Sequence, residues 1–152
     1  MHLTSKGRYA VSAMVDLAKN AGKGPITLAS ISERQYISLS YLEQLFRKLR
    51  ESGLVDSTRG PGGGYLLAKS PKDITISEIM HAVNETIRTT MCEHKTAGCL
   101  RGSRCETHNL WTALGHHIQS FLETVTVQDV CDDKSYQATL MAVEKTLLKS
   151  EL

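Results

Sequence analysis

The stretch SLSYLEQLFRKLRESGLVDSTRGPGGGYLLA, residues 38–68, decides the fold of this chain. Apolar residues in its first half recur at the spacing of one helical face: Leu42, Leu45, Phe46 and Leu49. Gly53 stands where the C-terminal cap of such a helix is expected. The second half indicates two short strands, 54–58 and 65–68, joined by the glycine-rich loop 59–64. The stretch therefore predicts a helix followed by a β-hairpin.

Two more helices are predicted before this stretch. Ser5 can cap the first, whose apolar residues share one face: Ala10, Val11, Met14, Leu17 and Ala18. Glycines and a proline within residues 22–25 end this helix, and Thr27 opens a short second one that carries Leu28 and Ile31. Three helices and a hairpin are the plan of a winged helix-turn-helix domain. We therefore expect a mostly α fold with a small β-hairpin.

The helix predicted over 38–53 has a polar outer face. Residue types that a major-groove helix uses for phosphates and base edges line it: Glu43, Gln44, Arg47, Lys48 and Arg50. Ser38 and Ser40 lie at its N-terminus, where hydroxyl and backbone N–H groups can bind phosphate. In the loop, Arg59 stands beside glycines that let the backbone approach a narrow groove. Plain solvation of the helix face and a merely flexible hairpin are the alternatives.

Glu43 has two possible roles at this point. With Ser40 as the N-cap, the two residues form the Ser-x-x-Glu pattern of a capping box. With Ser38 as the cap, Glu43 lies one turn inside the helix and projects outward. Its carboxylate could then accept a hydrogen bond from cytosine N4 and exclude other bases. The sequence leaves both roles open.

Charge is unevenly distributed along the chain. Residues 1–70 contain ten Lys or Arg and five Asp or Glu, a net charge of +5. Residues 71–152 contain eight against eleven, a net charge of −3. The basic half is where double-stranded DNA would bind, although a solvated basic surface produces the same bias.

Length and composition exclude several classes of protein. At 152 residues the chain can bury one fair-sized core, and with 5% aromatic residues that core must be aliphatic. The N-terminal MHLTSKGRYA lacks the apolar stretch of a cleavable signal, and no run approaches the roughly 18 apolar residues of a membrane span. We therefore expect a cytoplasmic protein with no membrane partner. In that reducing compartment, clustered cysteines are metal ligands more often than disulfides.

Four potential metal ligands lie within a seventeen-residue segment: Cys92, Cys99, Cys105 and His108. Three thiolates and an imidazole suit a tetrahedral Zn²⁺ as well as an iron–sulfur cluster. Zinc sites usually contain paired cysteines about two to four residues apart, which are missing here. The longer gaps can wrap around a [2Fe-2S] core, which needs two ligands on each iron. Cys131 stands apart and is interpreted as an incidental or buried thiol.

Three strings, together with this segment, carry a resemblance to a known family: LTSKGRYAV at 3–11, ISLSYLEQLF at 37–46 and RGPGGGYLL at 59–67. Over roughly residues 1–130 the chain resembles the iron–sulfur cluster regulator family of winged-helix transcription factors. The resemblance implies a homodimeric repressor or activator that binds promoter DNA, holds a [2Fe-2S] cluster and performs no catalysis. It also implies control of cluster biogenesis genes, with the cluster assembly machinery as the source of the cluster.

The resemblance assigns roles to individual residues. The cluster ligands would be Cys92, Cys99, Cys105 and His108. The DNA-binding surface would comprise Ser38, Ser40, Tyr41, Glu43, Gln44, Arg47, Arg59, Gly60 and Gly62. The gap between the first two cysteines holds six residues, one more than in the family pattern, and His94 within it is a rival ligand. An electron-transfer iron–sulfur protein and a zinc-stabilised DNA-binding module are the alternative functions.

A long helix from Cys105 to about Val125 is predicted near the end of the chain. Its apolar stripe is wide: Leu110, Trp111, Leu114, Ile118, Phe121, Leu122 and Val125. Part of that stripe needs a surface beyond the winged domain, so we expect a two-fold dimer through this helix. Cys105 and His108 would lie in its first turn. Cluster binding would then order the segment that sets the spacing between the two DNA-reading helices.

These elements divide the chain into three units: a winged helix-turn-helix domain at 1–75, a cluster-binding loop with the dimerisation helix at 76–131, and a tail at 132–152. The tail has only a weak amphipathic pattern, in Leu140, Val143 and Leu147. We predict that it docks on the dimer or frays.

Overall fold

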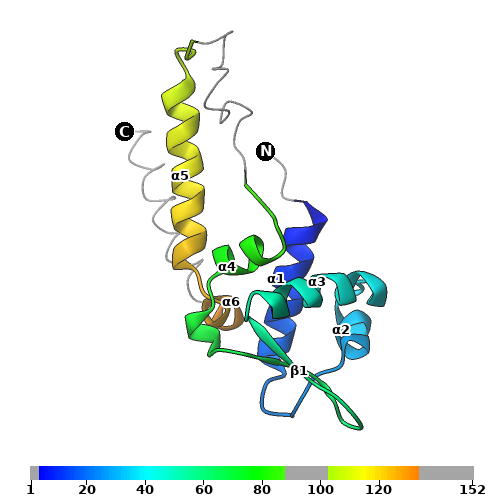
Figure 1. Ribbon diagram of the computed structural model, residues 1–152. Coiled ribbons are helices and arrows are strands. Elements are labelled where there is room, and N and C mark those ends of the chain that lie inside the picture. The colour runs from blue at the N-terminus through cyan, green and yellow to red at the C-terminus, as the bar shows by residue number, and fades with distance from the viewer. Residues whose placement is uncertain (1–3, 88–102, 134–152) are drawn as a thin grey trace.

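The computed structural model describes residues 4–87 and 103–133 of the chain, and Figure 1 shows how its elements are arranged. In chain order these are α1 (Ser5–Lys19), α2 (Leu28–Gln35), α3 (Leu39–Glu51), β1 (Val55–Thr58), β2 (Gly64–Leu67), the 3-10 helix η1 (Pro71–Asp73), α4 (Ile76–Ala82), α5 (His108–Thr124) and α6 (Val127–Asp132). The described part is mostly helical with one small antiparallel sheet, as predicted. None of its helices has the length and apolarity needed to cross a membrane.

The first two helices begin differently. Thr4, not Ser5, is the N-cap of α1, so the predicted cap was wrong by one residue. Thr4 makes no side-chain cap bond because its hydroxyl and its backbone N–H both donate to the carboxylate of Glu85. Thr27 caps α2 as predicted, since its hydroxyl oxygen accepts from the backbone N–H of Ser30 at 3.2 Å. Each of these two helices therefore begins after a Thr whose polar groups form hydrogen bonds.

One hydrophobic core joins the helices, and it is aliphatic as predicted. The buried residues of α1, α3 and α4 include Ala10, Ala13, Met14, Leu17, Leu42, Leu45, Phe46, Leu49, Ile76, Ile79 and Met80. Phe46 is the single aromatic residue among the buried positions of the described ranges, and its ring packs edge-on against Tyr65 of β2. Val125 and Val127 reach the same core from the far end of the chain, where α6 packs against α1.

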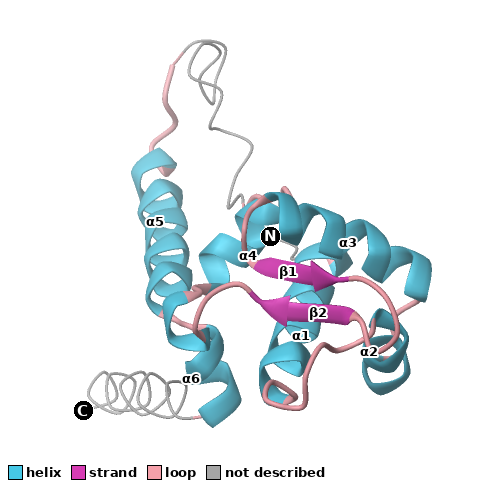
Figure 2. Ribbon diagram, turned by 60° about the horizontal axis from the view of Figure 1, so that its bottom comes forward, coloured by secondary structure: helices cyan, strands magenta, loops and turns pink. Residues whose placement is uncertain are grey.

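The hairpin is anchored to the helices through backbone hydrogen bonds. β1 and β2 pair antiparallel, with Val55 opposite Leu67 and Thr58 opposite Gly64. Ile26, in the link between α1 and α2, donates its N–H to the carbonyl of Tyr65 at 2.9 Å and accepts from the Tyr65 N–H at 2.7 Å. Figure 2 shows the hairpin tip on the α2 side of the molecule, away from α5. The wing therefore extends from a fixed base.

The long helix α5 projects away from the winged core and contacts α4 near its lower end (Figure 1). It begins at His108, so the predicted start at Cys105 was wrong. The Cys105 carbonyl instead accepts from the His108 N–H at 3.1 Å, which closes a turn just before the helix. At its other end the chain returns to the core, because Ile76 donates its N–H to the Val125 carbonyl at 2.9 Å.

Candidate DNA-binding surface and ligand segment

The N-terminus of α3 decides between the two roles considered for Glu43. Ser38 is the N-cap, with extended backbone angles of φ −60° and ψ 140°, and Ser40 lies within the helix. A capping box between Ser40 and Glu43 is therefore wrong, and Glu43 is exposed one turn inside the helix. The Ser38 side chain makes no cap bond, so its hydroxyl is available at the helix end.

The outer face of α3 is polar along its length. The exposed residues of this face are Ser40, Glu43, Gln44, Arg47 and Arg50. Arg47 donates to the Glu51 carboxylate at 3.0 Å, but both side chains are largely exposed, and such pairs contribute little stability. Tyr41 differs from the others because it is half-buried, with its ring edge-on to Tyr9 at a centroid distance of 6.0 Å. It thus lies at the border between the outer face and the core.

The glycines of the wing serve close backbone contacts and a tight turn. A Cβ on Gly64 would lie 2.4 Å from the carbonyl oxygen of Ile26, so only glycine permits the strand to bond there. Gly60 and Gly62 shape the loop with φ angles of 93° and 73°, which disfavour other residues. Arg59 is exposed in this loop and has no ion-pair partner within the described part of the chain.

An ion pair with a buried carboxylate joins α2 to α1. Asp16 of α1 is 5% exposed and accepts from Arg34 Nη2 at 2.7 Å, from Arg34 Nε at 3.0 Å and from Gln35 Nε2 at 2.9 Å. Burial alone raises the pKa of Asp16, but the hydrogen bonds from Arg34 and Gln35 outweigh it and hold that pKa below its ordinary value. This clamp was not predicted from the sequence. Its signal is a carboxylate between Met14 and Leu17 on an apolar helix face.

Only two of the four predicted metal ligands lie among the described residues. Cys92 and Cys99, with the rival ligand His94, lie outside the described residues. Cys105 is half-buried just before α5, and His108 is the first residue of that helix. The turn that joins their backbones places a thiol and an imidazole at one end of α5. Within the described ranges alone, no group of three metal-binding side chains comes together.

Cys131 lies elsewhere, half-buried in α6 against the hydrophobic core. Burial raises the pKa of its thiol above the ordinary value. His116 and His117 are exposed on α5.

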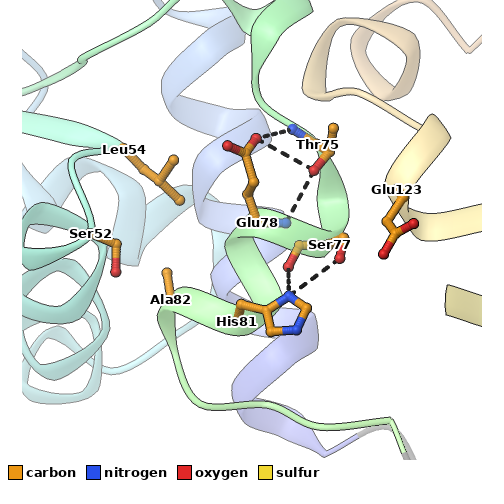
Figure 3. Close-up of a pocket in the computed structure, with 8 residues that line it drawn as sticks. All are labelled: Ser52, Leu54, Thr75, Ser77, Glu78, His81, Ala82 and Glu123. Atoms are coloured by element: carbon orange, nitrogen blue, oxygen red, sulfur yellow. Dashed lines mark hydrogen bonds between the residues drawn. The ribbon is translucent and has the colours of Figure 1, made fainter. Parts of the chain in front are cut away.

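A groove of about 550 Å³ lies between α4, the end of α3 and the base of α5 (Figure 3). Several of its polar side chains are already hydrogen-bonded. Glu78 accepts from Thr75 in a capping box, and His81 Nδ1 lies 2.9 Å from the Ser77 carbonyl. Gln119 of α5 donates to the Ser77 hydroxyl at 3.0 Å. The Gln119–Ser77 bond attaches α5 to α4, and we assign no ligand to the groove.

α5 itself buries no residue within the described part of the chain. Its large apolar side chains are exposed by 61% at Leu110, 41% at Trp111, 40% at Leu114 and 38% at Phe121. An apolar stripe of this kind is what an interface helix presents before it meets its partner.

The fold and the polar α3 surface define a winged-helix DNA-binding regulator. The model of the Rrf2 family, described as iron-dependent transcriptional regulators, matches residues 3–133. The chain belongs to the Rrf2 family.

The similar proteins support this class. The chain is 53% identical over 134 residues to the HTH-type transcriptional regulator IscR of Pectobacterium carotovorum. The aligned region covers 88% of this chain and 81% of that protein. The solved structure of T. potens IscR has a TM-score of 0.72 at 38% identity and covers 88% of each chain. The structure of CymR (YrzC), the global cysteine regulator of B. subtilis, has a TM-score of 0.76 at 32% identity and covers 88% of this chain and 98% of that one. The predicted family resemblance and fold class are confirmed, and the chain is a transcription regulator rather than an enzyme.

Proposed function

We propose that this regulator is a cytoplasmic homodimer that binds promoter DNA and selects its sites according to the occupancy of a [2Fe-2S] cluster. The observation that carries the DNA-binding part is the geometry of α3. Four apolar residues of this helix are buried, and the opposite face is polar and exposed beside the wing. Its bacterial relatives are named as transcriptional regulators, and bacterial DNA lies in the cytoplasm.

In this proposal α3 lies in the major groove. Gln44 and Arg47 face base edges and phosphates, while the Ser38 and Ser40 hydroxyls and the helix N-terminus bind the backbone. Arg47 can exchange its exposed partner Glu51 for a phosphate at little cost. Arg59 in the wing, with Gly60 and Gly62 around it, enters the adjacent minor groove, where small residues permit close approach.

Salt dependence tests this arrangement. The affinity for duplex DNA should fall with salt at a log–log slope of roughly 0.9 per neutralised phosphate. Arg59→Ala should weaken binding by about 1 to 3 kcal/mol if Arg59 reads a groove, and less if it meets only phosphate. An interaction with DNA that salt leaves unchanged would contradict the proposal.

Glu43 has the role of excluding bases. Its carboxylate is exposed and takes no part in a cap, so Glu43→Ala should leave thermal stability nearly unchanged. The variant should bind a broader set of sequences in a selection from random DNA, because a group that repels unwanted acceptor edges is gone. If the preference is unaltered, Glu43 does not belong to the recognition surface.

The homodimer forms through α5 in this proposal. A second copy of α5 would cover the exposed apolar stripe and place two α3 helices at two half-sites. The proposed domains of the chain are 1–75, 76–131 and 132–152. The last unit lies almost entirely outside the described residues.

The ligands proposed for the cluster are Cys92, Cys99, Cys105 and His108. The described donors fit such a group in chemistry, because a half-buried thiol and an imidazole are three residues apart in the turn at the start of α5. When bound, the cluster supplies a redox-active and oxygen-sensitive centre that is present only while cluster supply is adequate. A neutral imidazole in place of a thiolate can protonate and leave, which suits a sensor.

The cluster would influence DNA binding through α5. Its cysteine ligands would lie in the segment before this helix and its histidine ligand is the first residue of the helix, so occupancy would determine how that segment is held near the dimer interface. Cluster assembly machinery would supply the cluster, and the regulated genes would include those for cluster biogenesis.

A comparison of two cysteines tests the switch. Cys105→Ala should abolish the coloured cluster while a folded dimer remains, because the core of the winged fold does not include Cys105. Cys131→Ala is the matched control, since Cys131 is also half-buried but lies in α6. His108→Cys should retain a cluster that is lost less readily, and a His94→Ala variant tests the rival ligand.

The decisive measurement is DNA binding by cluster-loaded and cluster-free protein across several promoter sequences, with iron, sulfide and zinc analysis after anaerobic purification. Different site preferences in the two states would support the proposal. Identical preferences would mean that the cluster is not the signal. Zinc without sulfide, together with loss of fold on chelation, would favour a structural zinc module. A reversible redox couple without DNA binding would favour an electron-transfer protein.

A further inference from the structure

Tyr36 has a backbone conformation that tyrosine rarely adopts. It lies in the turn between α2 and α3, with φ 54° and ψ 39° in the left-handed region. Among the described residues only two other non-glycine positions have positive φ, Asn84 and Asp133. Asn and Asp tolerate this region because their short polar side chains bond locally, whereas a bulky residue there is strained. Tyr36 is therefore the exceptional case of the three.

The neighbours of Tyr36 hold it in this conformation. On one side, the Gln35 amide donates to Asp16 Oδ2 at 2.9 Å. On the other side, Ile37 is 3% exposed in the core, and its carbonyl accepts from the Ser32 hydroxyl at 2.6 Å. Because both flanking residues are fixed, the Tyr36 backbone cannot relax without breaking these contacts.

The side chain of Tyr36 gains nothing from packing within the protomer. It is 94% exposed, whereas the other exposed large hydrophobic residues of the described chain lie between 37% and 61%. A glycine at this position would avoid the strain at no loss of buried surface. Strain of this kind is typical of functional sites, where the benefit is realised with a partner.

The partner is indicated by position. Tyr36 lies two residues before Ser38, the N-cap of α3. The turn that contains it is at the N-terminal end of α3, on the same side of the molecule as the wing tip (Figures 1 and 2). When a recognition helix enters the major groove, the turn before it faces the phosphates of the groove wall.

We propose that Tyr36 is a DNA-backbone contact whose phenol hydroxyl donates a hydrogen bond to a phosphate oxygen at the edge of the major groove. This inference rests on the proposed DNA-binding function. The left-handed turn directs the ring outward, and the hydrogen bond positions α3 without reading sequence. A neutral donor replaces no cation on the phosphate, so the contact contributes affinity but no salt dependence.

The test compares Tyr36→Gly and Tyr36→Phe in the full-length, cluster-loaded protein. Tyr36→Gly should raise the melting temperature by a few degrees, because glycine adopts positive φ freely. It should also weaken duplex DNA binding roughly tenfold on specific and unrelated sequences alike. Tyr36→Phe should weaken binding to a similar extent with an unchanged melting temperature, and both variants should keep the salt slope of the parent.

Asn84→Gly is the matched control, because it replaces a second non-glycine residue of positive φ by glycine, at an exposed position just after α4. It should leave DNA affinity unchanged. If the parent protein binds DNA and Tyr36→Gly binds it equally well, the inference is overturned while the proposed function stands. If Tyr36→Phe retains full affinity while Tyr36→Gly does not, the hydroxyl contact is overturned. If the parent itself fails to bind duplex DNA, the inference and the proposed function fail together.

Discussion

The winged core and the long helix α5 differ in how far they bury their apolar side chains. In the core, α1 and α3 each bury one apolar face, and the buried carboxylate of Asp16 accepts hydrogen bonds from Arg34 and Gln35. On α5, no residue is buried and four large apolar side chains remain exposed. The two regions are nevertheless joined, because Val125 at the end of α5 lies in the core.

This difference shows which part of the molecule is complete within one chain. A core that buries its apolar surface and pairs its polar groups gains most of its stability alone. A helix with an uncovered apolar stripe gains its stability from a second surface. We therefore expect changes in the core to act on folding, and changes on α5 to act on association.

The two phenylalanines of the chain provide the largest test of this contrast. Phe46 is fully buried, whereas Phe121 on α5 is 38% exposed. Phe46→Ala should lower the free energy of unfolding by roughly 3 to 5 kcal/mol, independent of protein concentration. Phe121→Ala should cost less, and its effect should shrink on dilution, because a residue that acts through the dimer contributes to stability only while the protein is dimeric. Urea unfolding at several protein concentrations would show this. Equal, concentration-independent losses would remove the distinction between the two regions.

A charge on the stripe of α5 should separate the proposed dimer. Leu114→Asp places a carboxylate within the apolar stripe, whose burial is costly. The dimer dissociation constant should rise at least about a hundredfold, or roughly 2.7 kcal/mol. Ser120→Asp adds the same charge to another side of the helix and serves as the control. Sedimentation of both variants gives the answer, and an unaffected Leu114→Asp dimer would require a different interface.

The clamp at Asp16 predicts how the core responds to acid. Because its pKa is lowered in the folded state, the contribution of Asp16 to stability is present above the ordinary pKa of about 3.9 and is lost as the pH falls through the lowered value. Asp16→Asn should reduce stability at neutral pH by about 2 kcal/mol and flatten this acid limb. Thermal melts between pH 2 and 7 measure both effects. An unchanged acid limb would show that the clamp contributes nothing.

The smallest effect contrasts two helix caps. The Thr27 hydroxyl accepts from the Ser30 N–H, so Thr27→Ala should cost about 1 kcal/mol of stability. Ser38 makes no such bond, so Ser38→Ala should cost only a few tenths and should instead weaken DNA binding. Melting curves beside DNA titrations distinguish the two. A large loss of stability in Ser38→Ala would assign this residue to folding.

Local patterns in the sequence were sufficient for the elements near α3. The stripe of Leu42, Leu45, Phe46 and Leu49 predicted the helix and its buried face, because helical spacing alone brings these residues together. The two strands and their loop were predicted within a residue of their bounds. Thr27 was correctly identified as a cap, since capping depends on residues three apart in the chain.

Contacts between distant residues lay beyond such patterns. Ser5 was predicted as the first cap, but Thr4 occupies that position and bonds to Glu85, which is 81 residues away. The start of α5 was misplaced because the turn closed by Cys105 and His108 interrupts an otherwise helical pattern. The choice between Ser38 and Ser40 as the cap of α3 was also open until the helix was in place.

The sequence by itself thus determined the winged-helix class, the family and the residue types of the α3 surface, because these depend on short-range periodicity and on long specific strings. Only the tertiary structure decided that Asp16 clamps α2, that Tyr36 is held in a left-handed turn, and that α5 leaves its apolar stripe uncovered. The physical reason is common to all three. Burial, partnership and strain depend on which surfaces meet in space, and residues far apart in the chain supply those surfaces.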